Sequence, residues 1–490
     1  MTQPTRILSL AAVFAALAAC SGPVGDPGGL AGIGGTGIGT GGGGNVAGIG
    51  GTGITTTGTI TGFGSIFVNG IEFDTGSARI SLDDSPGGED DLGLGMVVTV
   101  TGTVDDSGRR GVAEQVVFDD AVQGPVATIT PSPDGQRKTL AVLGVRVLAE
   151  RASTVFEHTG FDSLQPGDVV EVSGFVNGDG LLHATRIEKK IALRPGESEI
   201  ERKGVISGLD TAAQRFTLDG LTVDYRNAEL KDLPGGLADG QAVEVKGSLA
   251  GGLIQATRIE AEDEPLSGAS GRVSLEGLVS DFVSRDDFRV NGQRVDASQA
   301  RLEPAGLVLA NGREVEVEGT LVDGVLKAEK VEARGGDIEL AARLAAVDSS
   351  AGTLTLDFFP GTVTVRVDSR SLLHDDEGGQ PLRLDQLAPG DFVTVKGYLA
   401  GAAVVASKVK REKEPDDDVL RGPASACDGS QVTVLGLSYA LQPGVTEFDD
   451  DEDAGAFCAA VNAGQGLVEI EDKAGRRDGI ADKAEREGGD

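Results

Sequence analysis

The residues of this chain best suited to covalent chemistry are two cysteines near its C-terminal end, Cys427 in "PASACDG" and Cys458 in "GAFCAAV". A third cysteine, Cys20, belongs to a different motif described below. An even pair within one small domain indicates a disulfide if the protein lies in an oxidising compartment. Two buried free thiols are the alternative, and the lack of a C-x-x-C spacing argues against a redox-active pair. We therefore predict a Cys427–Cys458 disulfide.

Two acidic runs, Glu89–Asp91 and Asp449–Asp453, carry the side chains that a hard cation such as Ca²⁺ requires. Neither run has the D-x-D-x-D-G spacing of an EF-hand loop. We therefore predict solvated acidic loops, with neither a metal site nor a cofactor. If a cation binds one of these runs, the weak candidate ligands are Asp449, Asp450, Asp451, Glu452 and Asp453.

The histidines and the carboxylates do not form a recognisable catalytic set. His158, His183 and His374 stand in different parts of the chain, and none has partners at the spacing that a metal site or a Ser-His-Asp triad needs. We expect each histidine to be exposed on a strand or loop. Acidic residues are so frequent that no glycosidase-like pair can be singled out. The sequence therefore predicts no catalytic residue and a protein that is not an enzyme.

The charge of the chain excludes one class of partner. Lys and Arg number 43 and Asp and Glu number 77, so the formal net charge is −34. Binding of nucleic acid depends on a basic surface that neutralises phosphates. We therefore expect no nucleic-acid partner.

The elements that carry these residues repeat along the chain. "HATRIE" at 183–188 returns as "QATRIE" at 255–260, a period of about 72 residues, and such a period indicates tandem domains. Related stretches contain Ala113, Ala328, Ala406 and Ala481. A second landmark, V-x-V-x-G, precedes these alanines, as in "VEVSG" at 170–174, and drifts to "VEIED" at 468–472 before Ala481. Two landmarks in register predict six repeats, over residues 58–120, 124–190, 202–262, 272–334, 338–412 and 419–487.

Each repeat is predicted to be a small β-barrel. V-x-V-x-G alternates with the period of a strand, and A-x-x-I-E resumes a strand after a glycine-containing turn. A third landmark, such as "FRVNGQRV" at 288–295, has the N-G or D-G turn of a tight hairpin. About five short strands per repeat would leave open edges unless the sheet closes. We predict an all-β fold of six five-stranded OB-like barrels, with an SH3-like barrel or a short sandwich as alternatives.

The N-terminus resembles a bacterial lipoprotein signal peptide. Arg6 precedes the short apolar segment Ile7–Leu17, and "LAAC" at Leu17–Cys20 has the form of a lipobox. The resemblance implies removal of residues 1–19 and a lipid on Cys20, which anchors the protein to a membrane. Ser21 after the cysteine favours the outer membrane of a Gram-negative cell by analogy. Residues 20–57 carry "AGIGGTGI" twice without the G-K-[ST] of a phosphate-binding loop, and predict a flexible tether.

The repeats resemble a known family. "GTITGFGSIFVNGIEFDT" at 58–75, with the V-x-V-x-G and "ATRIE" strands, is similar to a domain of unknown function that occurs in tandem in secreted bacterial proteins and lipoproteins. The resemblance covers about 58–487, is sharpest in the first two repeats, and is weakest in the sixth, where Asp472 replaces the landmark glycine. It implies no activity. We therefore expect a non-catalytic binding or structural scaffold for an unknown envelope protein or surface ligand. The alternatives are a Ca²⁺-binding envelope protein and, third, a hydrolase.

Two charged junctions that contain proline, 194–203 and 410–418, are predicted to be linkers with few contacts across them.

Overall fold

The computed structural model describes residues 52–192, 196, 198–262, 266, 268–269, 271–376, 379–448, 453–464 and 467–487. Within these residues the chain is mostly β-strand, as predicted, with one α-helix, α1 (Ala454–Asn462), and two single-turn 3-10 helices. None of the described helices has the length and apolar character needed to cross a bilayer. Residues 1–51, which include the predicted signal peptide and Cys20, lie outside the described residues.

Repeat 2 shows how the strands of one repeat are connected. Its strands are β8 (Val122–Pro131), β9 (Arg137–Val142), β10 (Val145–Glu150), β11 (Val155–Glu157), β12 (Asp168–Val176) and β13 (Leu181–Ala192). Antiparallel pairs join β8 to β9 and β9 to β10, and β10 then pairs in parallel with β13. β13 pairs with β12, which returns to β8. The five strands thus close a ring, which leaves no open edge of the kind that templates aggregation.

Within each of repeats 1, 3, 4 and 5, the strands pair in the same order as in repeat 2. The orders are β1–β2–β3–β7–β6, β14–β15–β16–β19–β18, β20–β21–β22–β25–β24 and β26–β27–β28–β31–β30. Repeat 1 consists of β1 (Thr52–Gly62), β2 (Ile66–Val68), β3 (Ile71–Asp74), β4 (Arg79–Leu82), β5 (Ser85–Gly87), η1 (Glu89–Asp91), β6 (Val97–Val104) and β7 (Arg110–Phe118). Repeat 3 consists of β14 (Glu199–Asp210), β15 (Arg215–Leu218), β16 (Leu221–Asp224), β17 (Glu229–Lys231), β18 (Ala242–Ala250) and β19 (Leu253–Ala261). Repeat 4 consists of β20 (Arg272–Ser284), β21 (Asp287–Val290), β22 (Gln293–Asp296), β23 (Arg301–Glu303), β24 (Glu314–Val322) and β25 (Val325–Ala333). Repeat 5 consists of β26 (Ile338–Asp348), β27 (Thr353–Phe358), β28 (Gly361–Arg366), β29 (Leu372–Asp375), η2 (Leu384–Gln386), β30 (Phe392–Ala400) and β31 (Ala403–Arg411).

The first described strand, β1, corrects the C-terminal bound of the predicted tether. Residues 52–57 were assigned to the tether 20–57, but they form the start of β1. The Thr- and Ile-rich sequence of this stretch suits a strand, and it is held on both sides by β6 and β20. The boundary between the tether and repeat 1, predicted from glycine content alone, therefore lies too far towards the C-terminus.

The two landmarks of the sequence meet in the structure as one contact. The glycine of V-x-V-x-G lies opposite the alanine of A-x-x-I-E in every repeat from 1 to 5, in the pairs Gly102–Ala113, Gly174–Ala184, Gly247–Ala256, Gly319–Ala328 and Gly397–Ala406. The register shifts by one residue immediately before each of these glycines, as at a β-bulge. A Cβ atom on any of the five would come within 2.2 Å of a backbone carbonyl oxygen of the partner strand. Only glycine fits this position.

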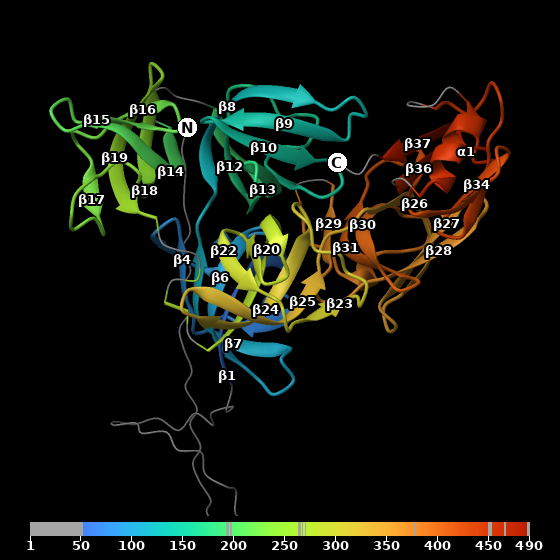
Figure 1. The fold of residues 1–490 in the computed structure, drawn as a ribbon, viewed down its shortest axis with the longest axis horizontal. Coiled ribbons are helices and arrows are strands. Elements are labelled where there is room, and N and C mark those ends of the chain that lie inside the picture. Colours follow the sequence, from blue (N-terminus) through green and yellow to red (C-terminus); the bar gives the residue numbers. More distant parts are fainter. Residues whose placement is uncertain are drawn as a thin grey trace, which may run out of the picture. The chain divides into compact units, whose positions relative to one another are not determined.

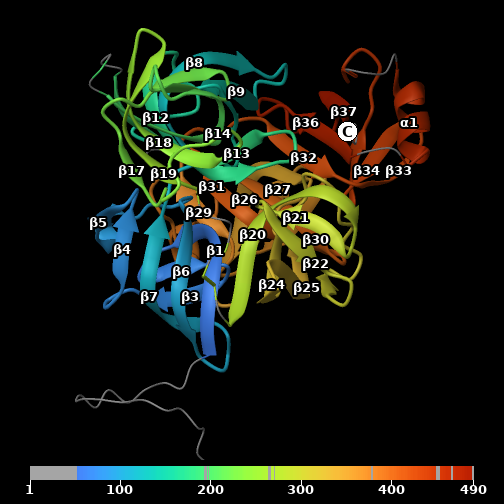
Figure 2. The same ribbon diagram turned by 60° about the vertical axis from the view of Figure 1, so that its left-hand side comes forward.

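The repeats are joined through their first strands. β1 runs parallel to β20, so that repeat 1 pairs with repeat 4, and Figure 2 shows these two strands side by side. β8 pairs with β14, and β26 pairs with β32 (Asp418–Gly422). Repeats 2 and 3 share one hydrophobic cluster, and repeat 5 shares another with the C-terminal segment (Asp418–Glu487). Figure 1 shows the strands of repeat 5 beside those of the C-terminal segment.

The prediction that junction 194–203 has few contacts across it is wrong for residues 199–203. β14 begins at Glu199, and Glu201 is buried where this strand pairs with β8 of repeat 2. Residues 194, 195 and 197 lie outside the described residues.

The C-terminal segment (Asp418–Glu487) differs from the closed barrel expected for residues 419–487. It contains β32, β33 (Ala424–Cys427), β34 (Gln431–Val434), β35 (Leu437–Ala440), α1, β36 (Leu467–Asp472) and β37 (Lys483–Glu487). β33, β34 and β35 form a separate three-stranded sheet. Within the described residues, the isolated bridge Ala440–Ile480 pairs this sheet with the stretch before β37. Pro423, which has no amide hydrogen to donate, interrupts the first strand between β32 and β33.

A disulfide joins Cys427 of β33 to Cys458 of α1, with their Cα atoms 5.0 Å apart. It ties the three-stranded sheet to the helix. We expect the intact mass of the oxidised protein to be lower by two hydrogens than that of the reduced protein. Reduction should destabilise the C-terminal segment by about 3–4 kcal/mol, because the cross-link limits the unfolded chain. Hydrogen exchange of peptides from β33 and α1, with and without reductant, measures this loss. Two freely alkylated thiols in native protein purified without reductant would contradict the prediction.

Candidate functional site

The weak metal candidates of the sequence do not form a described site. Asp449, Asp450, Asp451 and Glu452 lie outside the described residues, as does Cys20. Asp453 is described, and its carboxylate accepts a hydrogen bond from the backbone N–H of Ala456 (2.9 Å) at the start of α1. Asp453 is therefore an N-cap, which satisfies one free amide of the helix. The other acidic run, Glu89–Asp91, forms the exposed helix η1, in agreement with a solvated acidic segment.

The histidines are spread over the protein. His158 is exposed, as expected, and its Nδ1 lies 3.6 Å from Glu188. His183 is half-buried, and His374 on β29 is buried at 2% exposure, so the expectation of an exposed side chain is wrong for both. Burial lowers the pKa of His374 to about 4. β29 is covered because its Leu372 belongs to the hydrophobic cluster of repeat 1. Local sequence patterns could not predict this contact between two repeats.

Glutamates of the landmarks form buried pairs on the outer face of the barrels. The glutamate of V-E-V lies directly opposite the glutamate that ends A-x-x-I-E or its equivalent, in the pairs Glu171–Glu188, Glu244–Glu260 and Glu316–Glu332. Like charges directly opposite each other destabilise a sheet. Each pair has a lysine close by: Lys190 lies 2.8 Å from Glu171, Lys246 lies 2.9 Å from Glu244, and Lys330 lies 2.6 Å from Glu332. Neighbouring repeats cover these pairs, so charge is buried between barrels.

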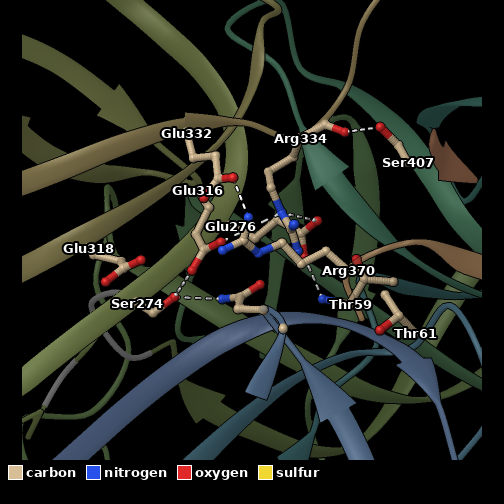
Figure 3. A network of polar contacts seen from close by, with 12 residues as sticks. Thr59, Thr61, Ser274, Glu276, Glu316, Glu318, Glu332, Arg334, Arg370 and Ser407 are labelled. Carbon is tan, nitrogen blue, oxygen red and sulfur yellow. Dashed lines mark hydrogen bonds and ion pairs between the residues drawn. The ribbon is translucent and has the colours of Figure 1, made fainter. Parts of the chain in front are cut away.

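One such region, which we call the Arg334 junction, lies between repeats 1, 4 and 5 (Figure 3). The buried guanidinium of Arg334 lies 3.9 Å from the carboxylate of Glu276 and 3.7 Å from that of Glu316. The other oxygen of Glu276 accepts a hydrogen bond from the backbone N–H of Thr59 on β1 (2.6 Å). Burial raises the pKa of both glutamates, while Arg334 opposes this rise.

The same junction is extended by polar contacts to repeats 1 and 5. Ser274 donates a hydrogen bond to Glu316 (2.7 Å) and accepts one from Asn69 of repeat 1 (2.9 Å). On the side of repeat 5, Arg370 forms an ion pair with Glu332, and the hydroxyl of Ser407 donates to the backbone oxygen of Arg334. Each carboxylate here has a cation or a hydrogen-bond donor. The arrangement therefore connects three repeats through buried charged and polar groups.

A second region, which we call the acidic junction, lies between repeats 1, 2 and 3. It consists of six carboxylates, those of Asp83, Asp119, Asp120, Glu171, Glu201 and Glu244. β4 and β5 pair as a hairpin whose two-residue turn is Asp83-Asp84, with φ of 46° and 66°. Both residues are left-handed, a conformation that aspartate tolerates better than most residues. The turn directs the carboxylate of Asp83 to the backbone N–H of Asp120, from which it accepts a hydrogen bond (3.0 Å).

Negative charge exceeds positive charge at the acidic junction. Within the described chain, the cations within 4.0 Å of its six carboxylates are Lys190, Lys203 and Lys246. Burial raises the pKa of Asp120 well above its usual range, and the neighbouring carboxylates add to the rise. Burial likewise raises the pKa of Glu201 to about 11 and that of Glu171 to about 7. These directions show a cluster that disfavours its own full ionisation.

Comparison with known families gives four matches to the domain of unknown function DUF5666, at residues 123–188, 203–260, 276–332 and 343–410. The matched stretches cover just over half of the chain. The chain belongs to the DUF5666 family. The family match falls on repeats 2 to 5, so the expectation that the resemblance is sharpest in the first two repeats is wrong for repeat 1. No curated protein matches the sequence.

The DUF5666 frame supplies only part of the two junctions. The cross-strand glutamates that meet there, such as Glu171 and Glu316, lie inside the matched stretches. Asp83, Asp120 and Arg334 lie outside them. The residues that complete the two junctions therefore lie outside the stretches that match the family.

The sequence carried a partial signal for these residues. The glutamates stand in the landmarks themselves, at the outward positions of V-E-V and I-E, and Asp119-Asp120 follow directly after the strand that ends in Phe118. Their burial could not be foreseen, because it depends on contacts between repeats.

Proposed function

We propose that this chain is a non-catalytic, lipid-anchored protein of the bacterial cell envelope whose repeats form a fixed scaffold for binding. The observation that carries the proposal is that buried charged residues take part in contacts between neighbouring repeats. The buried carboxylate of Glu276 in repeat 4 accepts a hydrogen bond from Thr59 of repeat 1, and the backbone oxygen of its ion-pair partner Arg334 accepts one from Ser407 of repeat 5. The first strands of repeats 1 and 4, β1 and β20, also pair with each other. A set of barrels held in this way presents its loops from a rigid frame, which suits recognition of an envelope protein or a surface ligand.

The finer architecture belongs to the same proposal. We propose six repeats with an OB-like barrel as their common plan. Support comes from the ring order seen in repeat 2, with its parallel pair β10–β13, and from the C-terminal segment, whose strands follow the same sequence of hairpin, V-x-V strand and final strand. The net charge of −34 supports a partner other than nucleic acid.

The anchor is tested by Cys20→Ser in a Gram-negative host. We expect the variant to lose labelling by a fatty-acid probe, and to remain unprocessed or to leave the membrane fraction, because the lipid is placed on the cysteine that follows the cleaved bond. Ser21→Ala, which leaves the cysteine intact, serves as the control and should still be labelled. Normal processing together with membrane fractionation of Cys20→Ser would contradict the anchor and with it the proposed outer-membrane location.

A further inference from the structure

The acidic junction contains a set of carboxylates whose charge is only partly neutralised by the described side chains. Asp83, Asp120 and Glu171 each offer one oxygen, and the three oxygens lie within 4.8 Å of one another. Asp120 is only 1% exposed, and neither of its carboxylate oxygens has a hydrogen-bond partner. An unpartnered buried carboxylate is strongly unfavourable, so buried carboxylates are normally paired or coordinate a metal. This position therefore calls for a positive group.

Two other groups of three carboxylates lie close by. They differ from the first group because lysine side chains already pair with most of their members. Asp83, Asp119 and Glu201 form one, and Lys203 and Lys246 already pair with its last two members. Asp84, Glu244 and Glu260 form the other, in which each member pairs with Lys231 or Lys246. In the first group only Glu171 forms an ion pair within the described chain, with Lys190. The excess of negative charge is therefore greatest at Asp83 and Asp120.

We propose that Asp83, Asp120 and Glu171 bind a divalent cation of the Ca²⁺ type between repeats 1 and 2. Two oxygens that bind one Ca²⁺ at about 2.4 Å can be at most about 4.8 Å apart, which the three oxygens satisfy. Two ligands come from a hairpin turn and an interdomain connection, and the third comes from β12. Ca²⁺ accepts such irregular sets of oxygens, whereas Mg²⁺ demands a near-ideal octahedron.

The proposed site borders a cleft that is open to solvent. This cleft, of about 520 Å³ between repeats 1 and 2, is lined by Asp83 and Glu171 but not by Asp120, and also by Asp90, Asp91 and Glu188. Acidic residues outnumber the basic residues of the lining, Arg186 and Lys190, so the cleft attracts cations and raises their local concentration. The bound ion would join repeat 1 to repeat 2. The site goes beyond the proposed scaffold function and differs from the acidic run Asp449–Asp453 that the sequence offered.

Calorimetric titration of the full chain, after removal of metals with a chelator, tests the proposal. We expect saturable binding of CaCl2, weaker binding of MgCl2, and a Ca²⁺ affinity at least about tenfold lower in Asp120→Asn and in Glu171→Gln, because each removes a charged ligand. The control Asp106→Asn changes an exposed aspartate in the β6–β7 turn of the same repeat and should bind as the wild type does. The anchor and the Arg334 junction are unaffected by any of these outcomes.

Melting temperatures distinguish a lost ligand from a damaged fold. In chelator, Asp120→Asn should melt at or above the wild-type temperature, because a neutral amide replaces an unpaired buried carboxylate. Ca²⁺ should raise the melting temperature of the wild type and of Asp106→Asn, but not that of Asp120→Asn. The proposal is overturned if the wild type shows no saturable Ca²⁺ binding, or if both ligand variants keep the wild-type affinity. It is also overturned if neutralising Asp449, Asp450, Asp451 and Glu452 abolishes the binding instead.

Discussion

Gly319→Ala is expected to destabilise repeat 4 by about 3 kcal/mol, at the upper end of the usual cost of overpacking. Gly319 lies at the bulge between β24 and β25, where an added Cβ would come within 2.1 Å of the backbone oxygen of Lys327 and 2.9 Å of the Cα of Ala328. Both obstacles are backbone atoms of a paired strand. A side-chain rotation cannot relieve the clash, so the two strands must separate locally.

Hydrogen exchange resolved by mass spectrometry measures this effect, because it reports local opening without assuming that a chain of several barrels unfolds in one step. We expect amides of β24 and β25 to exchange faster in Gly319→Ala, and those of repeat 2 to be unchanged. Gly306→Ala is the matched control in the same repeat, since nothing lies within 4 Å of its added Cβ and Gly306 is exposed. Equal protection in the two variants would show that the bulge can absorb a methyl group.

The same glycine illustrates how far the sequence predicts this fold. The repeat of V-x-V-x-G and A-x-x-I-E predicted the two strands and their connection, because alternation and turn residues are local properties of the chain. The landmark residues Gly319 and Ala328 recur because they touch each other across the strands. In the C-terminal segment, where Asp472 replaces the landmark glycine, the described strands do not form one closed ring, because β33, β34 and β35 form a separate sheet. Local patterns thus predicted the interior of a repeat.

Local sequence patterns could not predict the contacts between repeats. That β1 pairs with β20, more than two hundred residues later, depends on how closed barrels fit together, and no spacing in the sequence encodes it. The burial of Glu201 and of Asp120 follows from the same packing. For this reason the sequence directed attention to the dense acidic run Asp449–Asp453, whereas the acidic junction collects its carboxylates from three repeats. The disulfide is the opposite case, because cysteine count and spacing were enough to propose it.

Arg334→Met is expected to have the largest effect, a loss of about 3–5 kcal/mol in the stability of the contact between repeats 1 and 4. Methionine keeps much of the volume of the side chain but removes the charge that faces Glu276 and Glu316. Both carboxylates are buried, so the variant would leave the negative charges of Glu276 and Glu316 shielded from water and without the cation that faces them. The pKa of each is already raised by burial. Without Arg334 it should rise further, so the loss should shrink as the pH falls towards about 4.5, where the unfolded chain also binds these protons.

Two further variants separate this electrostatic effect from simple loss of packing. Arg301→Met removes an arginine of the same repeat whose side chain is 72% exposed beside Glu303, and it should change stability by less than about 0.5 kcal/mol. Arg334→Met combined with Glu276→Gln and Glu316→Gln should recover most of the loss, because neutral amides no longer need a cation. The opening free energies of β1 and β20 peptides, measured by hydrogen exchange, give the comparison. A loss below about 1 kcal/mol in Arg334→Met, or no recovery in the combined variant, would mean that the buried charges do not hold the two repeats together, since breaking a buried pair normally costs several times more.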